Sequence, residues 1–522
     1  MNRKIIDAVG MNFILRFINM FLGIMLTPLL FRMMGREELT GWFLIINNIP
    51  FLGLLDFGLT PTLWRRVSLI YGRLAVAKNQ RRITYLERRM RQMFATGKRL
   101  FEVRSIFAFF ISIIGGWFYI HTIRLTPGVQ NEIMIGWAVV AVSQAIQIRG
   151  SIWSVFLLST GNAALDVALT IITSTLDLAL RFVVVALGGG IIGLAIVTAV
   201  FVIARRLLSA WFARRRLPRW VEGKEGFSKT MVASLARPMF SAWLIGLGSF
   251  LILRTDQYFI VGLLDPKELP AYQGTLQVFA SLSQLALLTG GAAGVFLSHS
   301  WAAGKVEAFR TTVGLSLRIC LAILWFGIAT LMAIGSPFFT LWLNGAFVGY
   351  GLMMAFALST LLNAQTSVLM DADRSTEHEV YGKVVIICGL LNVIITYVLG
   401  KMFGLIGIAL STSIAVALTT GWVSAMHAQR RLGIGFFTVV APVQLMTAVM
   451  AAAIYGLIRG ANALTGTTVG PPQMTLAVAL AIGPPGLMLW IWFGIFSKSQ
   501  RSGLLRYARD TITRLMMRRG AS

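Results

Sequence analysis

Charged side chains inside long apolar segments are the residues of this sequence whose chemistry most needs an explanation. They are six arginines and four aspartates: Arg16, Arg149, Arg181, Arg237, Arg254 and Arg318, and Asp56, Asp166, Asp177 and Asp256. Each charge placed in a bilayer costs at least about 2.5–3.5 kcal/mol on insertion scales. Each therefore needs a partner, a water-filled cavity or a short route to the membrane surface.

Some of these charges have a simple structural explanation. Asp177 and Arg181 are one helical turn apart, and this spacing predicts a structural ion pair. Arg237, Arg318 and Asp166 lie near the inner ends of their apolar segments, where arginine snorkels to the interface and aspartate is solvated. Asp56 also lies near an inner end, and both a structural and a functional role stay open for it.

The remaining charges lie among other polar residues. Polar stripes at helical spacing are formed by Asn12, Arg16, Asn19 and Gly23 and by Gln273, Gln277, Ser281 and Gln284. Arg254 and Tyr258 are one turn apart with Asp256 beside them, and Arg149 follows Gln144 and Gln147. Hydrogen bonding between packed helices, worth about 0.6 kcal/mol per contact, is one explanation. Because arginine is too costly for that role alone, we expect the stripes to line a common aqueous cavity.

The excess of arginine over acid predicts an anionic substrate, since the planar guanidinium binds phosphate oxygens at two points. We expect Arg16, Arg149 and Arg254 to bind the anion, with Asn19, Gln277 and Gln284 as further substrate contacts. Asp256 and Asp56 are candidates for ion coupling or for orienting an arginine.

Motifs for covalent or metal chemistry are missing from the sequence. There is no G-x-x-x-x-G-K-[ST] loop, no Ser-His-Asp order and no pair among His121, His299, His378 and His427 with metal-ligand spacing. Cys320 and Cys388 lie in apolar segments, where packing is the natural role of a thiol. We therefore expect no enzyme activity, no cofactor and no metal site.

Composition identifies the elements that must position these residues. The chain has 522 residues, of which 57% are hydrophobic and 13% charged, about half the charge of a soluble protein. Recurring apolar segments predict an all-α polytopic membrane protein with 14 transmembrane helices. They lie near residues 11–33, 41–63, 105–123, 133–157, 164–187, 189–212, 233–264, 271–297, 311–334, 349–370, 381–400, 404–428, 436–458 and 474–497. We expect Pro238 in the opening turn of the seventh.

The basic residues predict the orientation. Outside the spans, all but six lie in segments of one side; the exceptions are Arg32, Arg36, Arg124, Lys267, Lys401 and Arg459. By the positive-inside rule both termini are cytoplasmic, and the net charge of +27 reflects topology rather than nucleic-acid binding. A basic cytoplasmic loop is expected at 65–104. Within it, 81–94 is predicted to form an amphipathic helix on anionic lipid headgroups, like 505–515, with docking of a cytoplasmic partner as the alternative.

Internal similarity indicates a duplication. Leu54–Leu74 matches Leu287–Val306, and Gly190–Thr198 matches Gly404–Thr412. The repeat unit is about six helices, and two such halves usually place a binding site between them. We expect an N-terminal lobe at 1–230, a C-terminal lobe at 231–430, and two further helices with a basic cytoplasmic end at 431–522.

Several motifs resemble those of a known superfamily. Gly53–Leu59 leading into Arg65-Arg66, Thr255–Gly262, Glu268–Tyr272, and Gly404–Leu410 after Asn392 are similar to the polysaccharide-transporter branch of the multidrug/oligosaccharidyl-lipid/polysaccharide (MOP) flippases. This branch comprises the O-antigen and exopolysaccharide repeat-unit flippases. The resemblance implies two rocking lobes that alternate between inward and outward openings. It also implies a substrate with a polyprenyl tail in the bilayer and a pyrophosphate-linked sugar in a cationic cavity.

The resemblance thus implies a bacterial inner-membrane flippase for a polyprenyl-pyrophosphate-linked oligosaccharide, with Gln277 and Gln284 on the sugar. A polysaccharide polymerase or glycosyltransferases are the implied protein partners. Three alternatives stay open: a lipid II flippase, a cation-coupled multidrug antiporter and a non-transporting scaffold of a polysaccharide-assembly complex. The antiporter is disfavoured because span one carries Arg16 and no acid, whereas drug exporters of the superfamily commonly use an acid there.

Overall fold

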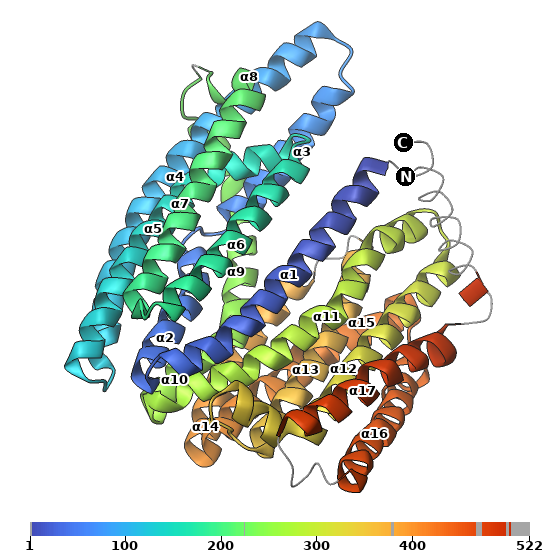
Figure 1. Cartoon of the computed structure of the whole chain (residues 1–522). Coiled ribbons are helices and arrows are strands. Elements are labelled where there is room, and N and C mark those ends of the chain that lie inside the picture. Colours follow the sequence, from blue (N-terminus) through green and yellow to red (C-terminus); the bar gives the residue numbers. More distant parts are fainter. Residues whose placement is uncertain (1–2, 224, 377–379, 466–471, 497–500, 503–522) are drawn as a thin grey trace, which may run out of the picture. The chain divides into compact units, whose positions relative to one another are not determined.

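The computed structural model describes residues 3–223, 225–376, 380–465, 472–496 and 501–502, with side chains described for all of these except 3–17, 289–296, 299 and 302. The described chain is helical and contains no strand (Figure 1). It divides into two compact units, one of Met1–Gln277, Trp342–Ala346 and Val380–Ala415, and one of Val278–Leu341, Phe347–Glu379 and Val416–Ser522. The lobes expected at 1–230, 231–430 and 431–522 stay a prediction.

The first unit contains most of the N-terminal helices. They are α1 (Arg3–Met33), α2 (Arg36–Leu54), α3 (Leu59–Ala75), α4 (Gln80–Thr122), α5 (Pro127–Ser159), α6 (Ala163–Ala186), α7 (Gly190–Arg216), the short α8 (Pro218–Val221), α9 (Lys229–Leu253), α10 (Asp256–Leu263) and the 3₁₀ turn η1 (Pro266–Glu268). The start of α11 (Leu269–Ala302) and most of α14 (Tyr381–Val416) complete it.

Small residues hold the core of this unit together. A Cβ on Gly41 of α2 would overlap with Ile133 of α5, and a Cβ on Gly136 of α5 would lie 3.0 Å from Ile191 of α7. Such glycines let helix backbones approach closely, which is how transmembrane helices gain packing energy without a hydrophobic driving force. In consequence α4, α5 and α7 lie side by side (Figure 1).

The second unit is built from the remaining helices. They are α12 (Val306–Trp342), α13 (Tyr350–Arg374), α15 (Trp422–His427), α16 (Ala441–Leu464) and α17 (Pro472–Trp490), with the π-helical turns η2 (Ala417–Gly421), η3 (Ala428–Leu432), η4 (Phe436–Val440) and η5 (Ile491–Ile495). One buried cluster joins Phe309 and Val313 of α12 to Leu369 of α13 and Leu432. Another joins Phe326 of α12 to Ile458 of α16 and Ala479 of α17.

The predicted polytopic membrane fold is confirmed. Within the described residues ten helices are long and apolar enough to cross a membrane, or eleven if the bent pair α2 and α3 is one span. Within the described residues each of the fourteen predicted ranges lies mainly on helix, with a break inside 41–63 and another inside 233–264. The lower count arises partly because 381–432 is one continuous helical stretch, although it contains two predicted spans. Many large apolar side chains on the helices are exposed, as a bilayer allows.

The segment 65–104 is mostly helical, as predicted for 81–94, and its location on the cytoplasmic side stays a prediction. Helix α3 continues to Ala75, and α4 begins at Gln80 and runs unbroken to Thr122. At 1.5 Å per residue, the 43 residues of α4 span about 65 Å, roughly twice the hydrocarbon thickness. The apolar face of 81–94 therefore belongs to an extension of a long helix. Leu86, Met90 and Met93 are buried against protein. The other amphipathic segment, 505–515, lies outside the described residues.

The predicted seventh span also differs from expectation. Pro238 lies inside α9, which begins at Lys229, so it does not occupy the opening turn. The helix then breaks after Leu253, and α10 begins at Asp256. Apolar residues lie on both sides of the polar Arg254–Gln257 segment, so the mean hydropathy of the whole range still suggests one span.

The glycines that begin the second matched pair share an unusual backbone. Gly190 has φ +55° at the start of α7, and Gly404 has φ +58° at the kink inside α14. Positive φ is accessible to glycine at little cost and strains other residues. A positive φ at both positions is consistent with a structural duplication.

Candidate functional site in the first unit

The break between α9 and α10 brings together Arg254, Thr255 and Asp256. Arg254 ends α9, and its backbone N–H still donates to the Phe250 carbonyl at 2.9 Å. The Thr255 hydroxyl donates to the Leu251 carbonyl at 2.8 Å. Asp256 lies in the first turn of α10, where the helix dipole favours a negative charge. Arg254 and Asp256 therefore lie at the two helix ends that meet at the break.

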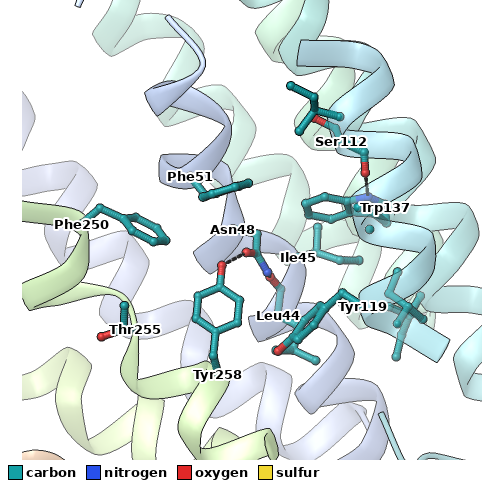
Figure 2. Close-up of a pocket in the computed structure, with 15 residues that line it drawn as sticks. Leu44, Ile45, Asn48, Phe51, Ser112, Tyr119, Trp137, Phe250, Thr255 and Tyr258 are labelled. Carbon is teal, nitrogen blue, oxygen red and sulfur yellow. Dashed lines mark hydrogen bonds between the residues drawn. The ribbon is translucent and has the colours of Figure 1, made fainter. Parts of the chain in front are cut away.

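Two asparagines of α2 contact this break. Arg254 Nη1 donates to the side-chain oxygen of Asn47 at 3.2 Å. The Tyr258 hydroxyl donates to the side-chain oxygen of Asn48, whose amide nitrogen donates to the Leu44 carbonyl at 2.7 Å (Figure 2). The sequence predicted a polar stripe with Arg254 and Tyr258 but did not single out these asparagines. Adjacent amides within the apolar run of α2 are the signal that could have found them.

Asp256 does not pair with an arginine among the described residues. Its Oδ2 accepts a hydrogen bond from the buried Tyr272 hydroxyl at 2.6 Å, and its Oδ1 has no hydrogen-bond partner in the described chain. Arg254 is exposed and has no carboxylate oxygen within 4 Å in the same part of the chain. The site therefore contains a guanidinium group free to bind an anion and a buried carboxylate beside it.

Arg149 contacts a carboxylate on a neighbouring helix. Its side chain is 67% exposed, and its Nη2 lies 3.6 Å from Glu102 Oε1 on α4. This contact holds the Arg149 side chain only weakly, because an exposed ion pair contributes little to the free energy of folding. The structure thus places Arg149 beside a carboxylate in the same unit without burying it.

Asn19 and Gln277 form hydrogen bonds between helices. Asn19 donates to Ser174 Oγ and accepts from Thr175 Oγ1, both at 2.8 Å, which ties α1 to α6. Gln277 donates to the Gly23 carbonyl at 3.0 Å and accepts from Thr27 at 2.6 Å, which ties α11 to α1. These are the interhelical hydrogen bonds that the sequence allowed as an alternative to a cavity.

Two predicted substrate contacts cannot be joined to this site. Gln284 is exposed on the part of α11 that belongs to the second unit. Arg16 lies in α1, but its side chain is outside the described residues.

Asp56 has a local structural role. It lies in the bend between α2 and α3, and its Oδ2 accepts from the Thr60 backbone N–H at 2.9 Å, so it caps the first turn of α3. Arg104 donates to the Asp56 backbone carbonyl. Asp56 Oδ1 has no hydrogen-bond partner among the described residues.

Asp177 and Arg181, whose spacing predicts a pair, form a two-point ion pair within α6. Arg181 Nε lies 3.0 Å from Oδ1 and Nη2 lies 2.6 Å from Oδ2. The guanidinium also lies over the Trp42 ring, 5.4 Å from its centroid. Both charges are thus neutralised inside the bundle.

The structure also buries charges that the sequence assigned to the cytoplasmic segments. Arg206 of α7 is 9% exposed and donates to Ser154 on α5 at 2.7 Å. In the second unit the fully buried Asp373 forms an ion pair with Arg431. Within the described residues no group of three or more His, Cys, Asp or Glu side chains is placed to hold a metal ion.

No protein-family model matches the chain, and no curated protein matches it in sequence. Solved structures do match its fold. The lipid II flippase MurJ in an inward closed conformation gives a TM-score of 0.64 at 14% identity, covering 92% of this chain and 98% of that one. An inward-facing multidrug resistance MATE family transporter of the MOP superfamily gives 0.63 at 13% identity, covering 80% and 94%. A MOP superfamily transporter from Pyrococcus furiosus gives a TM-score of 0.55 at 14% identity, covering 80% of this chain and 95% of that one. Its description reports a reverse polarity of the binding pocket. The chain therefore has the fold of the MOP transporters.

Proposed function

We propose that this chain is a membrane flippase that moves a polyprenyl-pyrophosphate-linked oligosaccharide from the inner to the outer leaflet of a bacterial cytoplasmic membrane by alternating access. The fold supports a transporter, since the similar structures include a lipid II flippase and MATE transporters. Cytoplasmic termini, anionic lipids at the basic inner surface and partners among polysaccharide polymerases or glycosyltransferases belong to the same proposal.

One observation carries the preference for an anionic substrate. Arg254 lies at the end of a broken membrane helix, is exposed, and has an amide oxygen rather than a carboxylate as its described partner. An arginine in a membrane costs too much to be kept without a function. Its remaining N–H groups can bind a pyrophosphate at two points. In the proposal Arg16 and Arg149 join Arg254 on the anion, and Gln277 and Gln284 contact the sugar.

The test is transport by purified protein in liposomes. A fluorescent polyprenyl-pyrophosphate oligosaccharide is placed in the lipid, and its appearance in the other leaflet is followed by chemical quenching. Arg254→Ala is expected to slow transport at least tenfold, because hydrogen bonds to charged groups contribute about 1.5–3 kcal/mol. Arg254→Lys should retain part of the rate, since it keeps the charge and loses the fork.

Arg124→Ala is the matched control, because Arg124 is an exposed arginine in the connection between α4 and α5. It should transport like the wild type. If Arg254→Ala and Arg16→Ala both retain full transport and full surface polysaccharide in cells, the site assignment is wrong. The same liposomes loaded with lipid II distinguish the lipid II flippase. Uptake of organic cations identifies the antiporter.

Asp256 is the candidate for ion coupling. It is a buried carboxylate with one oxygen bonded to Tyr272 and the other without a partner in the described residues, so it can accept a proton or cation during the cycle. Asp256→Asn should abolish the dependence of transport on a proton or sodium gradient while substrate binding persists. Unchanged gradient dependence in this variant would exclude the coupling role.

A further inference from the structure

The first unit contains a cavity of about 430 Å³ that the proposed function does not use. It lies among α2, α4, α5, α9 and α10 and is lined mainly by apolar and aromatic side chains (Figure 2). Its size and lining fall in the range of binding sites for small apolar ligands, about 300–1,000 Å³ with a few polar groups.

Two glycines of α4 shape the cavity in opposite ways. Gly116 lets α4 approach α5, since a Cβ there would overlap with the Trp137 indole. That indole donates from Nε1 to the Ser112 carbonyl at 2.8 Å, which fixes the two helices together. Gly115 also lines the cavity, but nothing lies within 4 Å of the position that its Cβ would take. The space beside Gly115 is therefore unfilled by protein.

Polar groups of the lining gather at the break between α9 and α10. Tyr258 and Asn48 are bonded to each other. The Tyr119 ring packs on Tyr258 with centroids 5.4 Å apart, while its buried hydroxyl has no hydrogen-bond partner in the described chain. The Tyr119 hydroxyl can therefore donate to a ligand oxygen at this end. The rest of the lining offers almost nothing to water, which needs about two to four polar partners when buried.

The surroundings indicate what fills the cavity. Phe51 and Ile111 line it and remain 37% and 43% exposed. Both lie in the membrane-spanning part of their helices, where the solvent of an exposed apolar side chain is hydrocarbon. An apolar chain from the surrounding hydrocarbon can therefore reach this cavity.

We propose that this cavity binds one hydrocarbon chain of a membrane lipid, with the polar end of that lipid near Tyr119. Two lipids carry this chemistry, a phospholipid with its acyl chain and a polyprenyl-linked lipid with its isoprenoid chain. Neither Arg254 nor Asp256 lines the cavity, although Thr255 between them does.

The test is photolabelling of the full chain in liposomes, with one of two probes. One probe is phosphatidylethanolamine with a diazirine in its acyl chain, and the other is polyprenyl phosphate with a diazirine in its terminal isoprene unit. Label is expected on the α4 peptide 111–120 and the α5 peptide 133–137. The probe that labels more strongly identifies the lipid source, and labelling by both supports a site for hydrocarbon chains in general.

Gly115→Leu fills the cavity and is expected to reduce label on these peptides at least fivefold. Gly128→Leu is the control, because Gly128 is an exposed glycine of α5 that also has nothing within 4 Å of a Cβ. It should label like the wild type. Gly115→Met, whose flexible chain adapts to the space, serves if the leucine variant does not fold. Label absent from both peptides, or equal in the folded Gly115 variants and the wild type, would overturn the proposal.

Discussion

Removing Asp177 from its ion pair with Arg181 should unfold the first unit more easily without a direct effect on transport chemistry. The side chains are 16% and 8% exposed, and two hydrogen bonds of 3.0 and 2.6 Å join them. Asp177→Ala leaves the Arg181 guanidinium buried and uncompensated. Breaking a buried pair in this way costs about 3–5 kcal/mol. The measurement is the free energy of unfolding by denaturant in detergent or bicelles.

The double variant Asp177→Leu/Arg181→Met distinguishes a structural role of the ion pair from a role in transport. Replacing both charges by apolar side chains of similar size is often neutral or stabilising. We therefore expect it to regain most of the stability that Asp177→Ala loses, with transport preserved in liposomes. The size of the coupling between the two positions follows from the double-mutant cycle.

An exposed pair provides the control. Glu307 and Arg310 lie 3.8 Å apart, with side chains 87% and 43% exposed. Glu307→Ala should change the stability by no more than about 0.5 kcal/mol. If Asp177→Ala were as mild as this control, the reasoning from burial would be refuted. A stable double variant that no longer transports would show that the pair has a functional role.

Three further perturbations test the fold. Gly58→Ala should destabilise by more than about 1 kcal/mol in the same unfolding assay, because Gly58 has φ +71° and a Cβ would overlap with the Met239 carbonyl; an unchanged value would contradict the bend between α2 and α3. Asn392→Leu should cost about 1–3 kcal/mol, since the buried Asn392 amide donates to the Leu251 carbonyl at 3.0 Å; a neutral result would contradict that contact. The hydrogen bond from Arg91 to Glu225, 2.6 Å long, lowers the pKa of the Glu225 carboxyl. Because the pKa is lowered in the folded state, the contact stabilises that state at a pH above the ordinary glutamate pKa near 4.3. This stabilisation is lost as the pH falls through the pKa of the folded state. Hydrogen exchange of residues 222, 223, 225 and 226 should thus be faster in Glu225→Gln at neutral pH, and acidification of the wild type should remove the difference.

Much of the fold follows from local pattern. Apolar segments long enough to cross a bilayer predict the helices, and the i,i+4 spacing of Asp177 and Arg181 is sufficient to bring their side chains together. The match between Gly190–Thr198 and Gly404–Thr412 pointed to two glycines that the structure shows to share a positive φ, although the sequence analysis did not predict that backbone. The helices and the ion pair depend on neighbours in the chain, so one sequence is enough to predict them.

The boundaries of helices were predicted less well. The amphipathic helix predicted at 81–94 was treated as separate from the membrane span, because charge marks the end of a span, whereas arginine, leucine and methionine continue a helix readily in water. The break at Arg254 was missed because apolar residues lie on both sides of it. Hydropathy measures how apolar a segment is and does not show where a helix ends and another begins.

The sequence by itself determined that the chain is a polytopic helical membrane protein. The length of an apolar segment can be compared directly with the thickness of a bilayer, and the helical period can be read from the spacing of residues. Only the tertiary structure decided the partners. It directed Asn19 and Gln277 to neighbouring helices, bonded Asp256 to Tyr272, left Arg254 beside Asn47, and opened the cavity at Gly115. The physical reason is that a side chain's partner depends on the rotation and approach of two helices far apart in the chain. Neither quantity is encoded in the spacing within one helix.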